Sequence, residues 1–152
     1  MRTKFLSLAG IALLGVFAAG CGGGATETAA VESGVSKAQF IEQGDTLCGQ
    51  YDAKIAAAAK KAGKGASDPK WIEKTIVPDI KAQIDGVRSL TPPAGDEAAI
   101  TDMLDASDKA LKAGEKDPPS LMLSSGEDKS PFYDVAEDLA AYGFKVCAQP
   151  AT

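Results

Sequence analysis

The side chains that most often carry catalysis are scarce in this sequence. It contains no His and no Asn, which excludes Ser-His-Asp and Cys-His-Asn machinery and removes His as a zinc ligand. Ser67 and Lys70 have the Ser-x-x-Lys spacing of penicillin-interacting enzymes, but the companion Ser-Asp-Asn and Lys-Thr-Gly motifs are absent. Pro69, after a Ser-Asp pair, is instead typical of the first turn of a helix. We therefore expect no enzymatic activity.

Acidic side chains are the next candidates, because clustered carboxylates bind metal ions. Asp102, Asp105 and Asp108 follow one another at intervals of three residues, a spacing that walks round a helix without convergence. The alternating ligands, central Gly and terminal Glu of a calcium loop are absent here and around Glu127 and Asp128. We expect solvated helix faces and neither a metal nor a cofactor.

Three cysteines are the remaining reactive side chains, and the first of them follows an export signal. A basic tip precedes an apolar run at residues 5–19, which is too short for a membrane span of about 20 apolar residues. The run leads into Ala18-Ala19-Gly20-Cys21, which resembles the bacterial lipobox with Ala18 in place of the usual Leu. We predict a signal peptide at residues 1–20 and lipidation of Cys21. The alternative is an ordinary secretory signal cut near Ala18 or Ala19.

The residues after the first cysteine predict how the rest of the chain is held. Residues 21–35 are rich in Gly, Ala and Thr without apolar periodicity, which is typical of a flexible tether. Lipid on Cys21 would hold a domain of residues 36–152 at the extracytoplasmic face of the cell membrane. The net charge of −5 argues against nucleic acid and against adhesion to anionic lipid, which need clustered Lys and Arg. The expected partners are the membrane, through the lipid, and an unidentified envelope protein.

Apolar residues of the domain recur at helical spacing, beginning with two long segments. The first segment opens at Ser36, with Gln39 in the position of a capping box, and ends near Gly63. The second begins at Asp68-Pro69 and contains Pro78. Because proline lacks a backbone donor and crowds the preceding turn, we expect a kink or a break at residues 75–77.

Two further segments complete the predicted fold. The third starts with Asp96 as its cap and closes at Gly114. The last begins at Ser130-Pro131 and continues to Cys147. Since none of these stretches alternates like a strand, we predict an all-α fold, an antiparallel bundle of about four helices with the second one kinked or broken near Pro78.

Cys48 and Cys147 lie on the apolar stripes of the first and last predicted helices. In an exported protein we expect such cysteines to form a disulfide, with two free buried thiols as the alternative. Their pairing would leave Cys21 for lipid. Gly44 and Gly49 flank Cys48 within a helix, where each Gly costs up to about 1 kcal/mol relative to Ala. We therefore expect another backbone to approach closely there.

A short apolar run interrupts the polar connection between the third and last helices. Leu121, Met122 and Leu123 either fill the core as a short turn, which we favour, or form a patch that faces a partner. Together with Trp71, the run would line an interhelical cleft if the domain carries a small apolar ligand.

Three elements of the sequence resemble those of a known group of proteins. SKAQFI at residues 36–41, TPPAGDE at 91–97 and YGFKVC at 142–147 are similar, in this order, to small all-helical lipoproteins of actinobacteria. That family is functionally uncharacterised, so the resemblance implies a fold, a disulfide and a location but no activity. We expect a lipid-anchored extracytoplasmic lipoprotein that is a non-enzymatic binding or structural module of the cell envelope. The alternative is a carrier of small apolar ligands.

Overall fold

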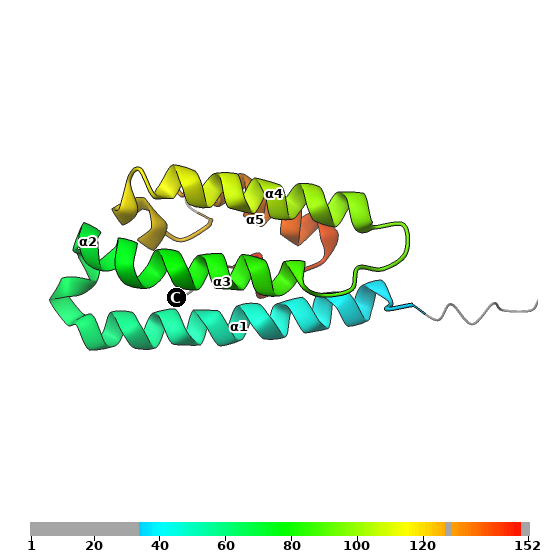
Figure 1. Cartoon of the computed structure of the whole chain (residues 1–152), viewed down its shortest axis with the longest axis horizontal. Coiled ribbons are helices and arrows are strands. Elements are labelled where there is room, and N and C mark those ends of the chain that lie inside the picture. Colours follow the sequence, from blue (N-terminus) through cyan, green and yellow to red (C-terminus); the bar gives the residue numbers. More distant parts are fainter. Residues whose placement is uncertain (1–33, 127–128, 150–152) are drawn as a thin grey trace, which may run out of the picture. The chain divides into compact units, whose positions relative to one another are not determined.

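The computed structural model describes residues 34–126 and 129–149, and these residues form helices and connecting turns without any strand. The predicted all-α bundle of four helices with one disulfide is confirmed. The signal peptide, Cys21 and most of the tether lie outside the described residues. In Figure 1, α3 lies between α1 and α4, neighbouring helices run antiparallel, and α5 packs against α4.

Helix α1 spans Lys37–Ala62 and has both of its predicted ends. The Ser36 hydroxyl accepts a hydrogen bond from the Gln39 N–H at 3.2 Å, and the Gln39 side chain accepts one from the Ser36 N–H at 2.9 Å. This capping box satisfies two donors that a helix start leaves unpaired. At the other end Gly63 adopts a φ of 56°, which side chains disfavour, so the helix stops there.

The second helical segment is divided into α2 (Pro69–Trp71), a π-helical turn η2 (Ile72–Ile76) and α3 (Val77–Arg88). Asp68 caps its start by accepting a hydrogen bond from the Trp71 N–H at 2.9 Å. The Val77 N–H donates to the carbonyl of Ile72, one residue further back than in an α-helix. The interruption predicted from Pro78 therefore takes the form of a π turn directly before the proline, and the chain continues as a helix.

Helix α4 spans Glu97–Gly114 and ends at the predicted glycine. Asp96 occupies the cap position, but its side chain does not cap the helix. Its carboxylate accepts a hydrogen bond from the Tyr142 hydroxyl at 2.7 Å instead. The predicted capping role of Asp96 is therefore wrong, and the residue connects the start of α4 to the end of α5.

The last helix is shorter than predicted, since α5 spans Tyr133–Tyr142. Gly143 adopts a φ of 123°, and its N–H donates to the carbonyls of Leu139 and Ala140. Positive φ ends a helix and turns the chain. Cys147 therefore lies in an irregular segment after the helix, while η3 (Pro118–Met122), a 3₁₀ turn, connects α4 towards α5.

The buried apolar side chains form two clusters. The larger one includes Phe40, Cys48 and Phe144, and the smaller one consists of Ile55, Ile72 and Ile76. Two half-buried side chains, Leu121 of η3 and Ile80 of α3, pack against both clusters. The helices thus share one bundle but pack around two centres.

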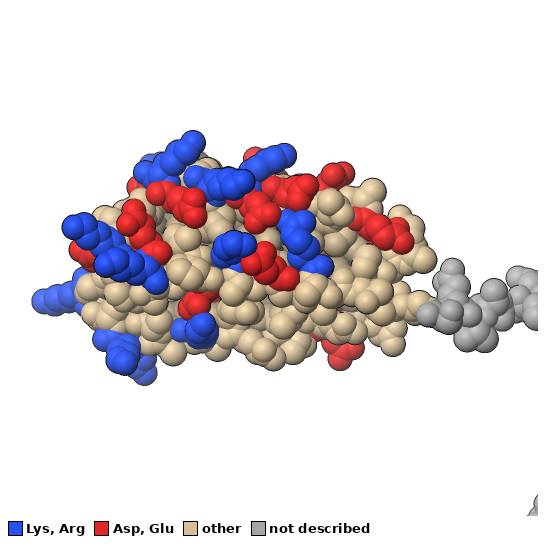
Figure 2. All heavy atoms as spheres, in the orientation of Figure 1, with Lys and Arg blue, Asp and Glu red and all other residues tan. Residues whose placement is uncertain are grey.

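The surface charges are unevenly distributed along the bundle. Lysines gather at the end formed by the last turn of α1, η1 (Gly63–Ser67), α2 and η2, as Figure 2 shows. They are Lys60, Lys61, Lys64, Lys70 and Lys74. The acidic average of the chain therefore conceals a locally basic end.

Candidate binding cavity

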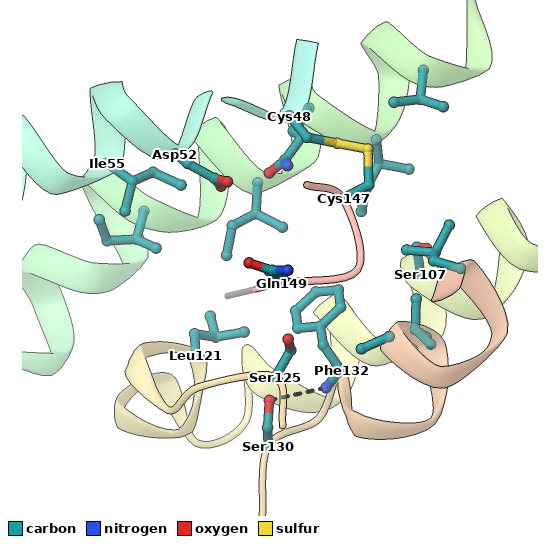
Figure 3. A pocket seen from close by; sticks show the side chains of 18 of the residues that line it. Cys48, Asp52, Ile55, Ser107, Leu121, Ser125, Ser130, Phe132, Cys147 and Gln149 are labelled. Carbon is teal, nitrogen blue, oxygen red and sulfur yellow. Dashed lines mark hydrogen bonds between the residues drawn. A yellow bond between two sulfur atoms is a disulfide. The ribbon is translucent and has the colours of Figure 1, made fainter. Parts of the chain in front are cut away.

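A cavity of about 160 Å³ lies between the helices and is lined by members of both apolar clusters. Its walls come from α1, η2, α3, α4, α5, the η3 turn and the chain after α5, as Figure 3 shows. Most of these walls are apolar, including Ile55, Ile80, Leu104 and Leu139. The wall residues that belong to helices lie on stripes that face inward, so the cavity is a part of the core that the helices do not fill.

The disulfide between Cys48 and Cys147 forms one wall of this cavity. The Cα atoms of the two residues are 5.2 Å apart, and the predicted pairing is confirmed. The bond joins α1 to the segment after α5, across 99 residues of sequence. It therefore fixes the position of the cavity wall contributed by the C-terminal segment.

A carboxylate of α1 also binds the segment after α5. Asp45 accepts hydrogen bonds from the backbone N–H groups of Lys145, Val146 and Cys147 at 3.0, 2.9 and 3.0 Å. Charge-assisted hydrogen bonds of this kind are stronger than neutral ones. Asp45 thus acts as an anchor for chain that has no helix to stabilise it.

Gly44 and Gly49 lie where this segment packs close to α1. A Cβ atom on Gly44 would lie 2.5 Å from the Phe144 ring, and one on Gly49 would lie 3.7 Å from a methyl carbon of Val146. The nearest neighbours of both glycines are side chains, and the backbone of their segment approaches α1 at the disulfide, where the Cα atoms of Cys48 and Cys147 are 5.2 Å apart. The small residue at Gly44 makes room for an aromatic ring.

Asp52 is the charged residue of the cavity wall. Its carboxylate points into the cavity from α1 in Figure 3. Burial raises the pKa of the Asp52 carboxyl above its ordinary value, because an apolar environment disfavours the charged form. Among the described residues, no hydrogen bond or ion pair engages this carboxylate, and the adjacent Lys54 donates to Asp79 of α3 at 2.7 Å instead.

A second polar group without a partner lies on the opposite wall. The Oγ atom of Ser125 is buried and makes no hydrogen bond within the described residues. Figure 3 shows it directed into the cavity, with the Gln149 amide nearby in the view. Ser130 differs, because its Oγ accepts a hydrogen bond from the Phe132 N–H at 3.3 Å. A buried hydroxyl without a partner costs about 1–3 kcal/mol, so the site favours a molecule that supplies one.

The apolar run Leu121 to Leu123 is divided between the core and the surface. Leu121 is half-buried, packs against both clusters and lies over Gly114. Met122 and Leu123 are 40% and 37% exposed, and all three side chains line the cavity. The run therefore closes the core with one side chain and adds two exposed apolar side chains to the cavity lining. Trp71 is not among the lining residues.

The acidic residues singled out from the sequence play a structural part. Asp105 and Asp108 both bind Arg88 of α3, at 3.1 and 2.7 Å, and Asp102 is exposed. Two of the three carboxylates thus converge, contrary to expectation, but on an arginine at the surface. Within the described ranges, no three His, Cys, Asp or Glu side chains are arranged to hold a metal ion.

One residue of the site carries a sequence signal that the prediction missed. Cys48, Asp52 and Ile55 are spaced by four and three residues and share one face of α1. A carboxylate on an otherwise apolar helix face indicates a polar group directed into the core. Ser125 and Gln149 lie in irregular chain and have no comparable signal.

Two further findings complete the description of the site. None of the helices in residues 34–126 and 129–149 has the length and apolar character needed to cross a membrane. Compared with protein-family models, curated proteins and solved structures, the chain matches none of them.

Proposed function

We propose that this chain is a lipid-anchored extracytoplasmic lipoprotein whose helical domain is a non-enzymatic binding module. The proposal of export and anchoring rests on the basic tip, the apolar run and the lipobox-like end at Cys21. The proposal of binding rests on one observation, the apolar cavity of about 160 Å³ whose walls hold polar groups without a partner among the described residues. In this proposal lipid on Cys21 positions the cavity at the envelope.

The size of the cavity limits what it takes. An apolar cavity of about 150 Å³ holds one benzene ring, whereas pockets for drug-sized ligands usually exceed about 300 Å³. Met122 and Leu123 line the cavity and are exposed to solvent, so a longer molecule can extend across them. These dimensions favour a small apolar ligand, or one ring or alkyl group of a larger one, over a large cofactor.

The same geometry supports a second form of binding, to an envelope protein. A partner would insert one bulky apolar side chain, with Met122 and Leu123 forming the exposed rim around it. Interfaces are often dominated by such single anchors in small pockets. We place the small-ligand form first, because the polar groups inside the cavity would meet no partner on an apolar side chain.

The anchoring part is tested by moving the chain off the membrane. We expect Cys21→Ser to shift most of the protein from the membrane fraction to the soluble extracytoplasmic fraction, because the thiol that would carry lipid is gone. Cys21→Ser with as much protein in the membrane as the native chain would contradict lipidation of Cys21. This experiment leaves the cavity untouched.

The binding part is tested by filling the cavity. Ala136 lines it and is buried, whereas Ala141 on the same helix is exposed. We expect the purified full-length chain to bind toluene in NMR titrations, Ala136→Leu to abolish binding and Ala141→Leu to leave it unchanged. Binding that survives Ala136→Leu would place the ligand elsewhere.

A further inference from the structure

The polar groups of the cavity walls suggest which chemical class of ligand the site takes, and this step rests on the proposed function. We propose that the ligand is a small amine, with its apolar body inside the cavity and its ammonium group against the Asp52 carboxylate. The apolar walls alone would accept any small hydrocarbon. The arrangement of Asp52, Ser125 and Gln149 adds a requirement for a head group that donates hydrogen bonds.

Asp52 is the main element of this requirement. A carboxylate in apolar surroundings is costly unless it is paired or hydrogen-bonded, and no described side chain pairs with it. Lys54, two residues further along α1, is engaged by Asp79 at 2.7 Å. Within residues 34–126 and 129–149 this negative charge at the cavity wall has no counter-charge, so a ligand cation would find a strong, charge-assisted hydrogen bond there.

Ser125 and Gln149 provide for the remaining N–H groups of an ammonium. An ammonium carries three donors, a hydroxyl oxygen accepts hydrogen bonds, and so does an amide oxygen. The Ser125 Oγ is buried and has no partner in the part of the chain that the structure describes, and Gln149 is exposed at the cavity. Figure 3 shows Gln149 between Asp52 and Ser125 in the view, so a head group beside Gln149 would meet acceptors from α1 and from the loop before α5.

A ligand with a negative or an apolar head would fit this site less well. An anion would face the Asp52 carboxylate without a basic residue to compensate, and a hydrocarbon would leave the Ser125 hydroxyl unpaired. A neutral alcohol would satisfy the hydrogen bonds but not the charge. The cavity therefore ranks heads in the order ammonium, hydroxyl, methyl, carboxylate.

Four probes with the same ring test this ranking in the full-length chain. Benzylamine, benzyl alcohol, toluene and benzoate differ only in the head group, and NMR titration at pH 7 gives each dissociation constant. We expect benzylamine to bind about tenfold more tightly than toluene, a factor that corresponds to one charge-assisted hydrogen bond of about 1.4 kcal/mol. We expect benzoate to bind most weakly.

A substitution at the wall separates the head group from the ring. Asp52→Asn should weaken benzylamine about tenfold and leave toluene within about twofold, because the volume of the side chain is kept and its charge is lost. Asp85→Asn, at an exposed carboxylate that binds Lys81, is the matched control and should change neither probe. Ser125→Ala should weaken benzylamine and benzyl alcohol by a smaller factor.

The outcomes distinguish the two levels of the proposal. Equal binding of all four probes, with loss in Ala136→Leu, would overturn the amine inference and keep the apolar site. An unchanged benzylamine affinity in Asp52→Asn would overturn it too. If no probe binds, the proposed ligand-binding function fails together with the inference.

Discussion

The bundle closes its two ends in different ways. The stapled end, defined by Phe40, Gly44, Tyr142, Phe144 and the disulfide, is held by rings, a covalent bond and the Asp45 carboxylate. The cavity end extends from the disulfide, which both ends share, to the smaller apolar cluster and Leu121, and is closed by a short 3₁₀ turn. Since both ends use the same long helices, the difference lies in the segments that close them. The short 3₁₀ turn leaves space that the side chains do not fill, and this space is the cavity.

The aromatic rings at the stapled end are closely packed. The rings of Phe40 and Phe144 meet edge to face with centroids 5.8 Å apart, and Tyr142 stacks on Phe144 at 5.6 Å. The Lys37 ammonium lies 3.9 Å from the centre of the Tyr142 ring. Burial, and then the hydrogen bond to Asp96, raises the pKa of the Tyr142 hydroxyl, which therefore stays protonated as a donor.

The largest effect should follow from cutting the covalent staple. We expect Cys48→Ala with Cys147→Ala to lower the free energy of unfolding by about 4 to 5 kcal/mol, because the bond closes a loop of about 100 residues in the unfolded chain. Urea unfolding of the variant and of the reduced native chain measures it. A loss below about 1 kcal/mol would mean that rings and Asp45 hold this end without the bond.

The next effect tests how rigid the stapled end is. Gly44→Ala would place a Cβ 2.5 Å from the Phe144 ring, and we expect a loss of about 2 to 3 kcal/mol because the ring is fixed by its neighbours. Gly49→Ala is the matched control, since its Cβ has ordinary contacts. It should stabilise the helix by about 0.5 to 1 kcal/mol. Similar losses in both would contradict the close packing at Gly44.

The same substitution at the cavity end should cost less. Gly114→Ala would place a Cβ that overlaps the Leu121 side chain. Leu121, however, belongs to a five-residue 3₁₀ turn, and the next two residues of the chain, Met122 and Leu123, are exposed. We expect a loss of about 1 kcal/mol, measured by the same unfolding experiment, because the turn can move and the helix gains from alanine. A cost equal to that of Gly44→Ala would remove the proposed contrast between the two ends.

The sequence was sufficient to predict the stapled end in outline. Both cysteines lie on apolar stripes, and Ser36 with Gln39 has the pattern of a capping box, so the pairing and the first helix follow from local rules. The early end of α5 did not follow, because the apolar spacing continues past Gly143 while the backbone leaves the helix there. Asp45, which is distant in sequence, binds that segment, and no local sequence pattern predicts this contact.

The cavity end was harder to predict, because it depends on what the chain fails to fill. The apolar run with Leu121 indicated a closing turn, and Asp52 on an apolar face was a readable signal of the site. The position of Ser125 depends on the tertiary course of an irregular loop. Trp71 belonged to an apolar stripe like the wall residues, but packing placed it against the smaller cluster, away from the lining.

The smallest predicted change in the free energy of unfolding concerns Asp52, and it is a gain in stability, not a loss. Burial raises the pKa of this carboxyl above 3.8, so the folded protein holds the proton more tightly than the unfolded chain. Stability from this group is therefore complete below pH 3.8 and is lost as pH rises through the folded pKa. We expect Asp52→Asn to gain less than about 1 kcal/mol at pH 7, reduced by solvent exposure.

The difference between native and Asp52→Asn unfolding free energies, followed from pH 3 to pH 8, isolates this group from the other carboxylates. The gain should appear as pH rises and vanish at the acid end, while benzylamine affinity falls in the same variant. Opposite signs for stability and binding are expected of a charge kept for a ligand, because function and stability compete at such sites. A variant that lost stability at pH 7 would instead make Asp52 a structural residue of α1.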